Sequence, residues 1–432
     1  MKTAIVVGSG AGGAVAAKEL QGRFRVTVLE AGKPFRPFSW NLEKLAKLKK
    51  TGIFMDEREI SLLFPAMRVQ KTEDRMVLVK GICTGGTTTL STGNAVRLDR
   101  DLKALGVDLD EEFAEIAREV PVSKDHGNLW RTATKELFKI CEELKLAPEP
   151  IAKMGRYERC ANCGRCVLGC PRGVKWDSRE YLQTALGRGA ELITGCQVKS
   201  VVIRDGLATG VKARMGIRSV LFPADLVVLA AGGLGTPVIL RNSGIECEPR
   251  LSVDPVLCVA AEWEKNRQNQ EVPMPFVVQR EDYLISPYFD HLSFYFNRNW
   301  AFPPQNILSL MIKLADKNEG SVSAHKVTKT LTLKDKERLQ EAVSLCRDVF
   351  ARLGVKPEKT FLGTINAGHP GGMLPLTEAE AKTFHSAKLP QNCYIADATL
   401  LPKSLGGPPI LTIIALAKRV SKICCQNLIA IT

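Results

Sequence analysis

The chain has 432 residues, of which 45% are hydrophobic and 25% charged, and 60 lysines and arginines against 46 acidic residues give it a net charge of +14. This composition is that of a soluble globular protein, because the chain lacks the low-complexity tracts and the scarcity of apolar residues that mark disorder. No apolar run is long enough to cross a bilayer, and the N-terminus does not have the pattern of a signal peptide, so we expect a cytoplasmic protein.

Residues 42–50 form a charged segment that we expect to be a surface helix, and they contain the densest basic run, which is Lys44, Lys47, Lys49 and Lys50. Apolar residues separate these lysines, but no aromatic side chain lies among them on which a nucleic-acid base could stack. The run therefore indicates a solvated surface, and we expect no nucleic-acid partner.

The first twenty residues have the pattern of a strand, a tight glycine turn and a helix. Thr3–Val7 is apolar and rich in β-branched side chains, Gly8, Gly10 and Gly13 follow, and Ala14–Leu20 has helical character. Such a turn lets backbone amides and the helix N-terminus approach a pyrophosphate, whose negative charge the helix dipole favours. The spacing predicts a Rossmann-type dinucleotide site.

A second predicted strand, Arg25–Leu29, ends in Glu30. An acidic residue at this distance from the glycine turn binds ribose hydroxyls and disfavours the 2′-phosphate of NADP. This context argues against a glycine turn without a ligand, and it leaves FAD and NAD as alternatives.

Further along the chain, the segment from Gly81 to Thr89 is rich in glycine and hydroxyl side chains, which is typical of a loop that lines a ligand. Val198–Leu221 alternates apolar and polar residues and predicts a small antiparallel meander. Ala224–Ala230 predicts a buried strand, and a helix is expected to start after Pro237.

Five motifs in this order resemble the glucose-methanol-choline (GMC) oxidoreductases. They are the glycine fingerprint at the N-terminus, the Gly85-Gly86 loop, Gly235-Thr236-Pro237 with Ser243-Gly244, His369-Pro370-Gly371-Gly372, and Tyr394-Ile395-Ala396-Asp397-Ala398. The resemblance implies an FAD-dependent oxidoreductase in which Gly85 and Gly86 lie along the flavin and Asp397 lies near its ribityl chain or ring.

The fold that this resemblance implies is α/β, with α+β character overall. A Rossmann-type FAD-binding domain is expected from residues 1–245 and 367–432, with a cysteine-rich insertion around 156–180. Residues 246–366 diverge from the family's motifs and are expected to form a substrate-binding domain built on an antiparallel sheet.

Oxidation of an alcohol needs a base, and the histidines are the candidates because histidine accepts protons near neutral pH. His369 lies in a glycine- and proline-rich turn where cholesterol oxidase-like members of the family carry their catalytic histidine. The family's second polar residue has its counterpart at Pro408, which has no side-chain hydrogen-bonding group. Asn366 is therefore a candidate partner of His369. The other histidines are expected to be structural or exposed and are His126, His291, His325 and His385.

The chain has 13 cysteines, and four of them, Cys160, Cys163, Cys166 and Cys170, form the pattern C-x2-C-x2-C-x3-C-P. This spacing is that of iron-sulfur ligands in bacterial ferredoxins, and it predicts a 4Fe-4S cluster. A zinc site and free or structural cysteines are alternatives. The fourth ligand is Cys170 or a remote cysteine such as Cys83.

Together these features predict a dehydrogenase that oxidises a CH-OH group of a small-molecule alcohol and passes electrons through the cluster. Six basic and two acidic residues between 156 and 179 favour a ferredoxin-like acidic protein as acceptor. Two alternatives are an oxygen-using oxidase with structural cysteines and a non-catalytic subunit that carries FAD and the cluster for electron transfer.

Overall fold

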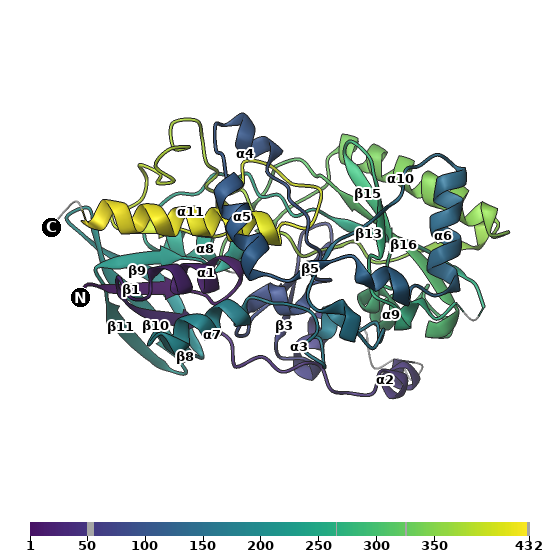
Figure 1. Ribbon diagram of the computed structural model, residues 1–432, viewed down its shortest axis with the longest axis horizontal. Coiled ribbons are helices and arrows are strands. Elements are labelled where there is room, and N and C mark those ends of the chain that lie inside the picture. The colour runs from purple at the N-terminus through teal and green to yellow at the C-terminus, as the bar shows by residue number, and fades with distance from the viewer. Residues whose placement is uncertain (50–55, 265, 325, 430–432) are drawn as a thin grey trace.

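A parallel sheet of five strands forms the centre of the lobe that contains both chain ends in the computed structural model, which describes residues 1–49, 56–264, 266–324 and 326–429 (Figure 1). Every residue of the strand Leu226–Leu229 and all but the first residue of the strand Thr3–Val7 are buried, as expected of a parallel sheet that is covered on both faces. The strand order is β21 (Cys393–Ile395), β12 (Leu226–Leu229), β1 (Thr3–Val7), β2 (Arg25–Glu30) and β8 (Glu191–Thr194).

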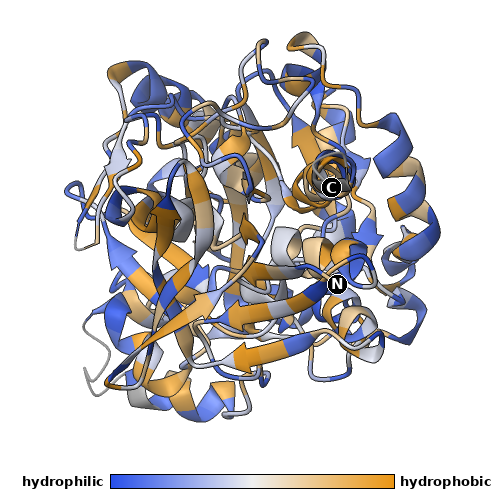
Figure 2. Cartoon of the chain, turned by 90° about the vertical axis from the view of Figure 1, so that its left-hand side faces the viewer, coloured by the Kyte–Doolittle hydropathy of each residue, from blue (hydrophilic) through white to orange (hydrophobic). Residues whose placement is uncertain are grey.

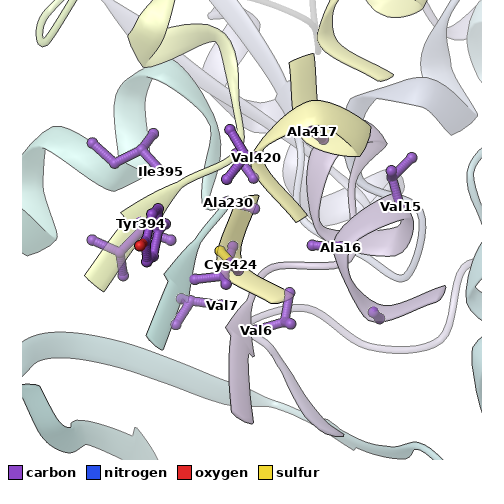
Figure 3. Packing of buried hydrophobic residues seen from close by; sticks show 14 of the residues in the cluster. Val6, Val7, Val15, Ala16, Ala230, Tyr394, Ile395, Ala417, Val420 and Cys424 are labelled. Atoms are coloured by element: carbon purple, nitrogen blue, oxygen red, sulfur yellow. The ribbon is translucent and has the colours of Figure 1, made fainter. Parts of the chain in front are cut away.

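Two helices from opposite ends of the chain, α1 (Ala11–Leu20) and α11 (Ile410–Ile429), pack against each other and belong to the same hydrophobic core as the sheet. Figure 3 shows Val15 and Ala16 of α1 beside side chains of α11 and the strands. The small side chains of Ala14, Ala16 and Ala17 in α1 are fully buried and allow this close approach. Figure 2 shows the same arrangement by hydropathy, with orange strands inside and blue segments on outlying helices.

An antiparallel meander follows β8, as the sequence predicted. It consists of β9 (Cys196–Arg204), β10 (Leu207–Met215) and β11 (Arg218–Pro223). The predicted strand at 224–230 corresponds to β12.

The helix that we expected to start after Pro237 begins at Gly232, before the proline, so that prediction was wrong. Helix α8 (Gly232–Asn242) contains Pro237 within it. The carboxylate of Asp397 accepts hydrogen bonds from the Gly232 backbone N–H at 2.8 Å and from the Thr236 hydroxyl at 2.5 Å. These contacts satisfy a free amide of the first turn and hold the turn in place before the proline.

The second lobe is built on a larger sheet in which the β20–β4 pair is parallel and the other pairs are antiparallel. Helix α10 (Leu333–Arg352) packs against this sheet and starts with a capping box between Thr332 and Asp335. The strand order is β3 (Met67–Lys71), β4 (Val77–Gly81), β20 (Asn366–Ala367), β13 (Val256–Glu262), β16 (Ile307–Leu314), β15 (Tyr283–Pro287), β14 (Phe276–Gln279) and β6 (Glu149–Pro150), and β19 (Thr360–Leu362) also pairs with β13.

The predicted fold class is confirmed, since the chain combines a parallel sheet flanked by helices with antiparallel sheets. The division at residues 245 and 367 stays a prediction. Strands β3, β4 and β6 come from the segment before residue 245 but join the second sheet.

The charged segment at 42–50 forms α2 (Leu42–Lys49), with Lys50 outside the described residues. The remaining elements are α3 (Ile60–Leu63), α4 (Arg100–Ala104), α5 (Asp110–Glu119), α6 (Thr132–Glu143), α7 (Arg179–Gly187), α9 (His291–Phe296), β5 (Val122–Ser123), β7 (Lys153–Met154), β17 (Ser321–Val322) and β18 (Val327–Thr328).

None of the helices within the described ranges is long and apolar enough to cross a membrane.

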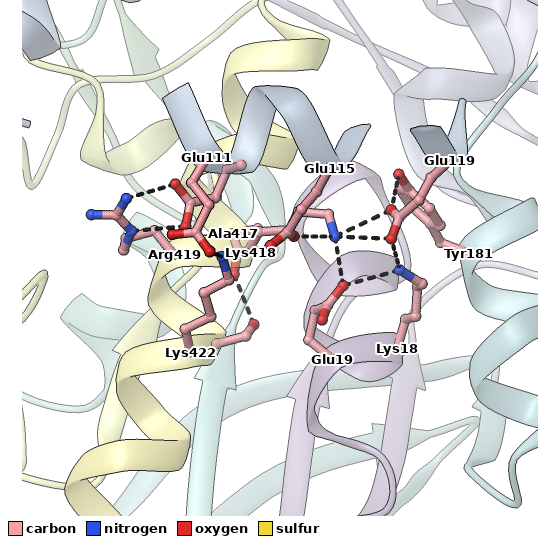
Figure 4. Close-up of polar contacts among 12 residues, drawn as sticks. Lys18, Glu19, Glu111, Glu115, Glu119, Tyr181, Ala417, Lys418, Arg419 and Lys422 are labelled. Carbon is pink, nitrogen blue, oxygen red and sulfur yellow. Dashed lines mark hydrogen bonds and ion pairs between the residues drawn. The ribbon is translucent and has the colours of Figure 1, made fainter. Parts of the chain in front are cut away.

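A buried lysine on α11 ties this helix to α1 and α5 (Figure 4). The Lys418 side chain is 1% exposed, and its Nζ lies 2.8 Å from Glu19, 2.9 Å from Glu115 and 3.2 Å from Glu119. Burial raises the pKa of Glu115 and Glu119, but hydrogen bonds and attraction from nearby lysines outweigh burial, so both pKa values lie below their ordinary value of 4.5.

We expect Lys418→Met to lower the free energy of unfolding by about 2–3 kcal/mol at pH 7, because it leaves three carboxylates facing one another. Since the pKa values of the glutamates are lowered by folding, their contribution is present above pH 4.5 and is lost as the pH falls through the folded-state values. The difference between wild type and variant should therefore shrink below that pH. Urea unfolding at pH 7 and pH 3.5 measures it.

Lys139→Met is the matched control, because Lys139 is exposed and pairs with Glu143 at 3.7 Å on the surface of α6. It should change stability by less than about 0.5 kcal/mol. Equal effects of the two substitutions would contradict the role given to Lys418.

Candidate active site

One cavity of about 550 Å³, called here the large cavity, brings together most of the residues that the sequence singled out. Both sheets contribute to its wall, from the β1–α1 turn at one end to β16 at the other. The predicted site residues that line it are Gly8, Gly10, Glu30, Gly86, Asn366, His369 and Asp397.

Glu30 fixes the geometry of the dinucleotide end of the large cavity. It is 5% exposed, and its carboxylate accepts hydrogen bonds from the Ser9 N–H at 3.1 Å, the Ser9 hydroxyl at 2.6 Å and the Gly32 N–H at 2.8 Å. Burial raises the pKa of Glu30, and these hydrogen bonds oppose that shift. The carboxylate thus orients the glycine turn, and Glu30 lines the large cavity.

The glycine turn meets the 85–90 loop at very short range. Gly86 has a φ of +54°, and a Cβ at that position would lie 3.0 Å from the Cα of Gly10. Gly13 and Gly85 do not line the large cavity. A Cβ on Gly13 would lie 2.0 Å from the carbonyl oxygen of Gly8, so this glycine allows α1 to pack on β1. The Gly85 N–H donates to the Ser9 hydroxyl at 3.1 Å and so joins the loop to the turn.

Asp397 is buried where α8 and β21 converge on the large cavity. Burial raises its pKa, against the hydrogen bonds that it accepts from Thr236, Thr399 and Gly232. Its hydrogen bonds hold the first turn of α8 and the short turn at residues 398–400, and the adjacent Ala398 also lines the large cavity.

His369 pairs with a carboxylate that the sequence did not indicate. Its Nδ1 lies 3.3 Å from Oδ2 of Asp254, and its side chain is 25% exposed, toward the large cavity that it lines. Burial and the positive charge of Lys313 lower the pKa of His369 below 6.5, although Asp254 opposes this shift. The imidazole is therefore neutral at pH 7 and can accept a proton.

Asp254 is held from three sides. Its other oxygen accepts hydrogen bonds from the Ser404 hydroxyl and the Gly406 N–H, and the buried Lys313 adds a positive charge. Burial would raise the pKa of Asp254, but His369, Lys313 and Ser404 lower it overall. Burial lowers the pKa of Lys313 to about 8.

Asn366 lines the large cavity but does not hydrogen-bond to His369 in the described structure. Its Nδ2 donates to Asp290 at 3.4 Å and to the Thr364 carbonyl at 3.1 Å. Asp290 is buried, caps α9 and also lines the cavity, and burial raises its pKa to about 6. Pro408 lines the same wall. A second polar pair therefore lies in the cavity with His369.

The rest of the wall is apolar and includes residues that the sequence did not indicate. Segments around α2 and α3 and the end of β15 supply most of it, and several of these side chains are aromatic. The lining includes Phe38, Leu42, Leu45, Leu63, Phe64, Tyr288, Tyr295 and Phe296.

The remaining described histidines have structural contacts. His126 and His385 each bind a backbone carbonyl, of Ile151 at 2.7 Å and of Pro390 at 3.0 Å. His291 lies 3.2 Å from the Gly164 carbonyl and lines the large cavity. His325 lies outside the described residues.

The four clustered cysteines line a second, small cavity of about 20 Å³, and we call them the cysteine site. Backbone N–H groups donate to two of the sulfurs, from Asn162 to Cys160 at 3.4 Å and from Val174 to Cys170 at 3.3 Å. Cys83 is not part of this wall and lies 3.5 Å from the Thr89 hydroxyl. Among the described residues, no three His, Cys, Asp or Glu side chains are arranged to hold a metal ion.

Residues 3–256 match the family model described as GMC oxidoreductase. The chain is 25% identical over 426 residues to the uncharacterized protein MJ1450 of Methanocaldococcus jannaschii, with 96% of this chain and 97% of that protein covered.

Two other relatives match a shorter part. The uncharacterized GMC-type oxidoreductase Rv0492c of Mycobacterium tuberculosis is 32% identical over 57% of this chain, and the long-chain-alcohol oxidase FAO4A of Arabidopsis thaliana is 26% identical over 56%. These matches span only 40% and 34% of the relatives' own lengths.

The fold has a solved counterpart in pyridoxine 4-oxidase from Mesorbium loti, with a TM-score of 0.72 and 15% identity over 98% of this chain and 99% of that one.

Replacing Glu30 should weaken the binding of FAD. In Glu30→Ala the glycine turn loses two hydrogen bonds from Ser9 to a buried carboxylate, and the chain after β2 loses one from Gly32. We expect the affinity for FAD to fall by about tenfold or more. Flavin fluorescence titration of the apoprotein measures the change. Glu191→Ala on neighbouring β8 is the control, since Glu191 is exposed. FAD affinity equal to wild type in Glu30→Ala would contradict this assignment.

Proposed function

Because this chain belongs to the GMC oxidoreductase family, whose members bind FAD, and is an FAD-dependent oxidoreductase, we propose that it is a dehydrogenase that oxidises the CH-OH group of an apolar alcohol. The observation that carries the proposal is the large cavity, which runs from the glycine turn to the His369–Asp254 pair. The dinucleotide end is polar and lined by backbone groups, and the other end is apolar.

The residues that would hold FAD fit that cofactor. Gly10 and Gly86 both line the large cavity and approach each other closely, so backbone groups and no side chains would face the cofactor there, and Glu30 would face its ribose. Asp397 fixes the turn of α8 that lines the same wall. Bound FAD supplies the acceptor for the hydride that leaves the alcohol carbon.

His369 would take the proton of the substrate hydroxyl. Because its Nδ1 faces Asp254, its Nε2 is the nitrogen that can accept this proton. The carboxylate of Asp254 would stabilise the resulting imidazolium. The alcohol thus loses a proton from oxygen and a hydride from carbon and becomes a carbonyl compound.

Asn366 and Asp290 would serve in place of the polar residue that the family carries at the position of Pro408. Both line the large cavity and are hydrogen-bonded to each other. An amide N–H and a carboxyl group at this position can orient a substrate hydroxyl by donating to or accepting from it.

The apolar part of the wall supports an apolar substrate. Aromatic and aliphatic side chains from residues 38–64 and 288–296 surround this part of the cavity. Burial of an alkyl chain there would contribute about 0.8 kcal/mol for each CH₂ group. The long-chain-alcohol oxidase among the relatives is consistent with this substrate class.

The cysteine site would hold a 4Fe-4S cluster as the exit for electrons. Four thiols in ferredoxin spacing, with two backbone N–H groups donating to sulfur, are a suitable donor set. The described side chains are not arranged to hold a metal ion, and the cavity that they line has only about 20 Å³, so the loop would have to rearrange to bind a four-iron cluster. A bound cluster carries electrons one at a time. The exposed Arg156, Arg159 and Arg172 nearby suit an acidic, ferredoxin-like acceptor.

Anaerobic purification tests the proposal. The expected result is one bound FAD with about four irons and four acid-labile sulfides per chain, and reduction of the flavin by a long-chain alcohol. Zinc or no metal at the cysteine site would overturn the electron exit. Stoichiometric peroxide in air without electron transfer to a ferredoxin would favour the oxidase alternative.

His369→Ala should slow reduction of the flavin by alcohol by about 100- to 10,000-fold while FAD stays bound, because the variant lacks the proton acceptor. Anaerobic stopped-flow measurement of flavin absorbance checks this result. His385→Ala is the control, since His385 contacts Pro390 and does not line the large cavity. An unchanged rate in His369→Ala would remove this residue from the mechanism.

The pH profile provides a separate test of the His369–Asp254 pair. Since the pKa of His369 lies below 6.5, flavin reduction should be constant at neutral pH and fall as the pH drops through that lower value. In Asp254→Asn the pKa should fall further, because the carboxylate is what raises it. We expect the acid limb to move to lower pH and the plateau rate to fall by about 100-fold. An acid limb at the same pH in wild type and in Asp254→Asn would contradict the proposed pairing of His369 with Asp254.

A further inference from the structure

One buried lysine in the wall of the large cavity has no contact partner of its own. Lys313 lies on β16, is 3% exposed and lines the large cavity. Within the described ranges its ammonium group forms no hydrogen bond and no ion pair, and it interacts with Asp254 and Asp316 only through longer-range attraction. An ammonium group has three N–H donors, and all three are unused here.

The other buried lysines of the described ranges all have partners. Lys329 lies 2.5 Å from Asp316, and Lys418 contacts three glutamates. Lys153 donates to a backbone carbonyl at 2.6 Å, and Lys175 donates to three backbone carbonyls at 2.8 to 3.0 Å. Buried polar groups without a partner are rare in folded proteins. The free donors of Lys313 therefore call for an acceptor that binds in the large cavity.

The two carboxylates that attract Lys313 are committed to other groups. One oxygen of Asp254 lies 3.3 Å from Nδ1 of His369, and the other accepts from a hydroxyl and from a backbone N–H. Asp316 forms an ion pair with Lys329 and accepts from two backbone N–H groups at 3.1 and 2.8 Å. These carboxylates thus compensate the charge of Lys313 from a distance and leave its N–H groups free.

The register of the second sheet places Lys313 beside the proposed site of proton transfer. Val256 of β13 pairs with Lys313 of β16 on one side and with Asn366 of β20 on the other. All three residues line the large cavity, so they form one row across three adjacent strands. The positive charge of Lys313 also acts on His369, which follows Asn366 by three residues. The ammonium group, the imidazole and the amide therefore belong to the same end of the cavity.

We propose that Lys313 is a second catalytic residue, whose ammonium group donates a hydrogen bond to the oxygen of the substrate's CH-OH group and stabilises the alkoxide that forms there. The O–H bond breaks, its proton moves to Nε2 of His369, and the oxygen keeps the electron pair beside Lys313. The C–H bond then breaks, hydrogen leaves with the electron pair as a hydride to the bound flavin, and a C=O bond forms. Lys313 keeps its own proton. This inference rests on the proposed function, which supplies the alcohol and the flavin.

A positive charge at this position acts on the rate more than on the binding of the alcohol. The hydroxyl oxygen is neutral in the bound alcohol and gains negative charge only as the proton leaves. An interaction that strengthens in the transition state raises the limiting rate, whereas uniform binding would only raise the affinity. Such stabilisation is strongest in a cavity that excludes water.

The test uses the anaerobic FAD-loaded enzyme, 1-decanol and stopped-flow measurement of flavin absorbance. In Lys313→Met the limiting rate of flavin reduction should fall by about 100-fold, while the apparent Kd of the alcohol changes by less than about threefold. Lys313→Arg keeps a positive charge at the same place and should recover most of the lost rate.

Lys317→Met is the matched control. Lys317 follows β16 by three residues, but its side chain is 65% exposed, pairs with Glu319 and does not line the large cavity. Removing this exposed charge should change the limiting rate by less than about twofold.

Ligand binding gives a readout without turnover. Decanoate carries a charged oxygen in place of the alkoxide, and decanamide is its neutral counterpart of the same length. By calorimetry, Lys313→Met should weaken the binding of decanoate by about 30-fold and that of decanamide by less than about threefold. Equal losses for the two ligands would contradict a role of the lysine charge.

The pH profile of the wild type needs no variant that removes the charge. Burial lowers the pKa of Lys313 to about 8, so the limiting rate should fall as the pH rises through that value and the ammonium group loses its proton. The titratable groups that interact with Lys313 are Asp254, Asp316 and His369, and Asp290 in the same cavity has a pKa of about 6. The limb belongs to Lys313 if Lys313→Arg lacks it, because a guanidinium group stays charged up to pH 10.

The outcomes separate the two proposals. A wild-type flavin that no alcohol reduces would overturn the proposed function. A wild-type flavin that 1-decanol reduces, with the same limiting rate in Lys313→Met, would overturn the role of Lys313 alone. Should Lys313→Met not fold, a basic limb that is present in wild type and absent in Lys313→Arg supports this role, and the same limb in both proteins overturns it.

Discussion

The hydroxyl of Ser9 is the contact on which the two sites depend. It donates to the buried carboxylate of Glu30 and accepts from the N–H of Gly85, so it joins the glycine turn, the second strand and the 85–90 loop. The Ser178 hydroxyl donates to the Gly85 carbonyl at 3.0 Å from the opposite side. Since Ser178 lies three residues after Lys175, this hydrogen-bond network places the cysteine segment against the loop.

Elsewhere in the interior, groups of opposite charge are buried together. At the substrate end, His369, Asp254 and Lys313 form one cluster in which the lysine lowers and the carboxylate raises the pKa of the imidazole. Each charge is costly when buried alone and acceptable within the cluster. The pKa of His369 is therefore lowered by burial and by Lys313 on β16 and raised by Asp254 before β13, so it depends on groups outside the turn that carries this histidine.

The sequence brought together the residues around the glycine turn that line the large cavity, because their signals are local; their role in binding a dinucleotide stays a prediction. The first strand, the glycine turn and Glu30 all lie within the first thirty residues, and the four cysteines of the C-x2-C-x2-C-x3-C pattern lie within eleven residues. Asp254 could not be found this way, since it reaches His369 across 115 residues through sheet pairing, and no motif surrounds it. The start of α8 was wrong for the same reason: Asp397, 165 residues away, fixes the first turn of that helix.

The register of the second sheet explains how the polar groups of the substrate end come together without a side chain at Pro408. Val256 pairs with Asn366 across β13 and β20, and this pair sets Asp254, two residues before β13, near the turn that carries His369. The strand ends of one sheet thus supply His369, which we propose as the base, together with Asp254 and Asn366. A proline is tolerated before α11 because hydrogen bonding at the site is already provided by this sheet, and its fixed φ suits the approach to the helix.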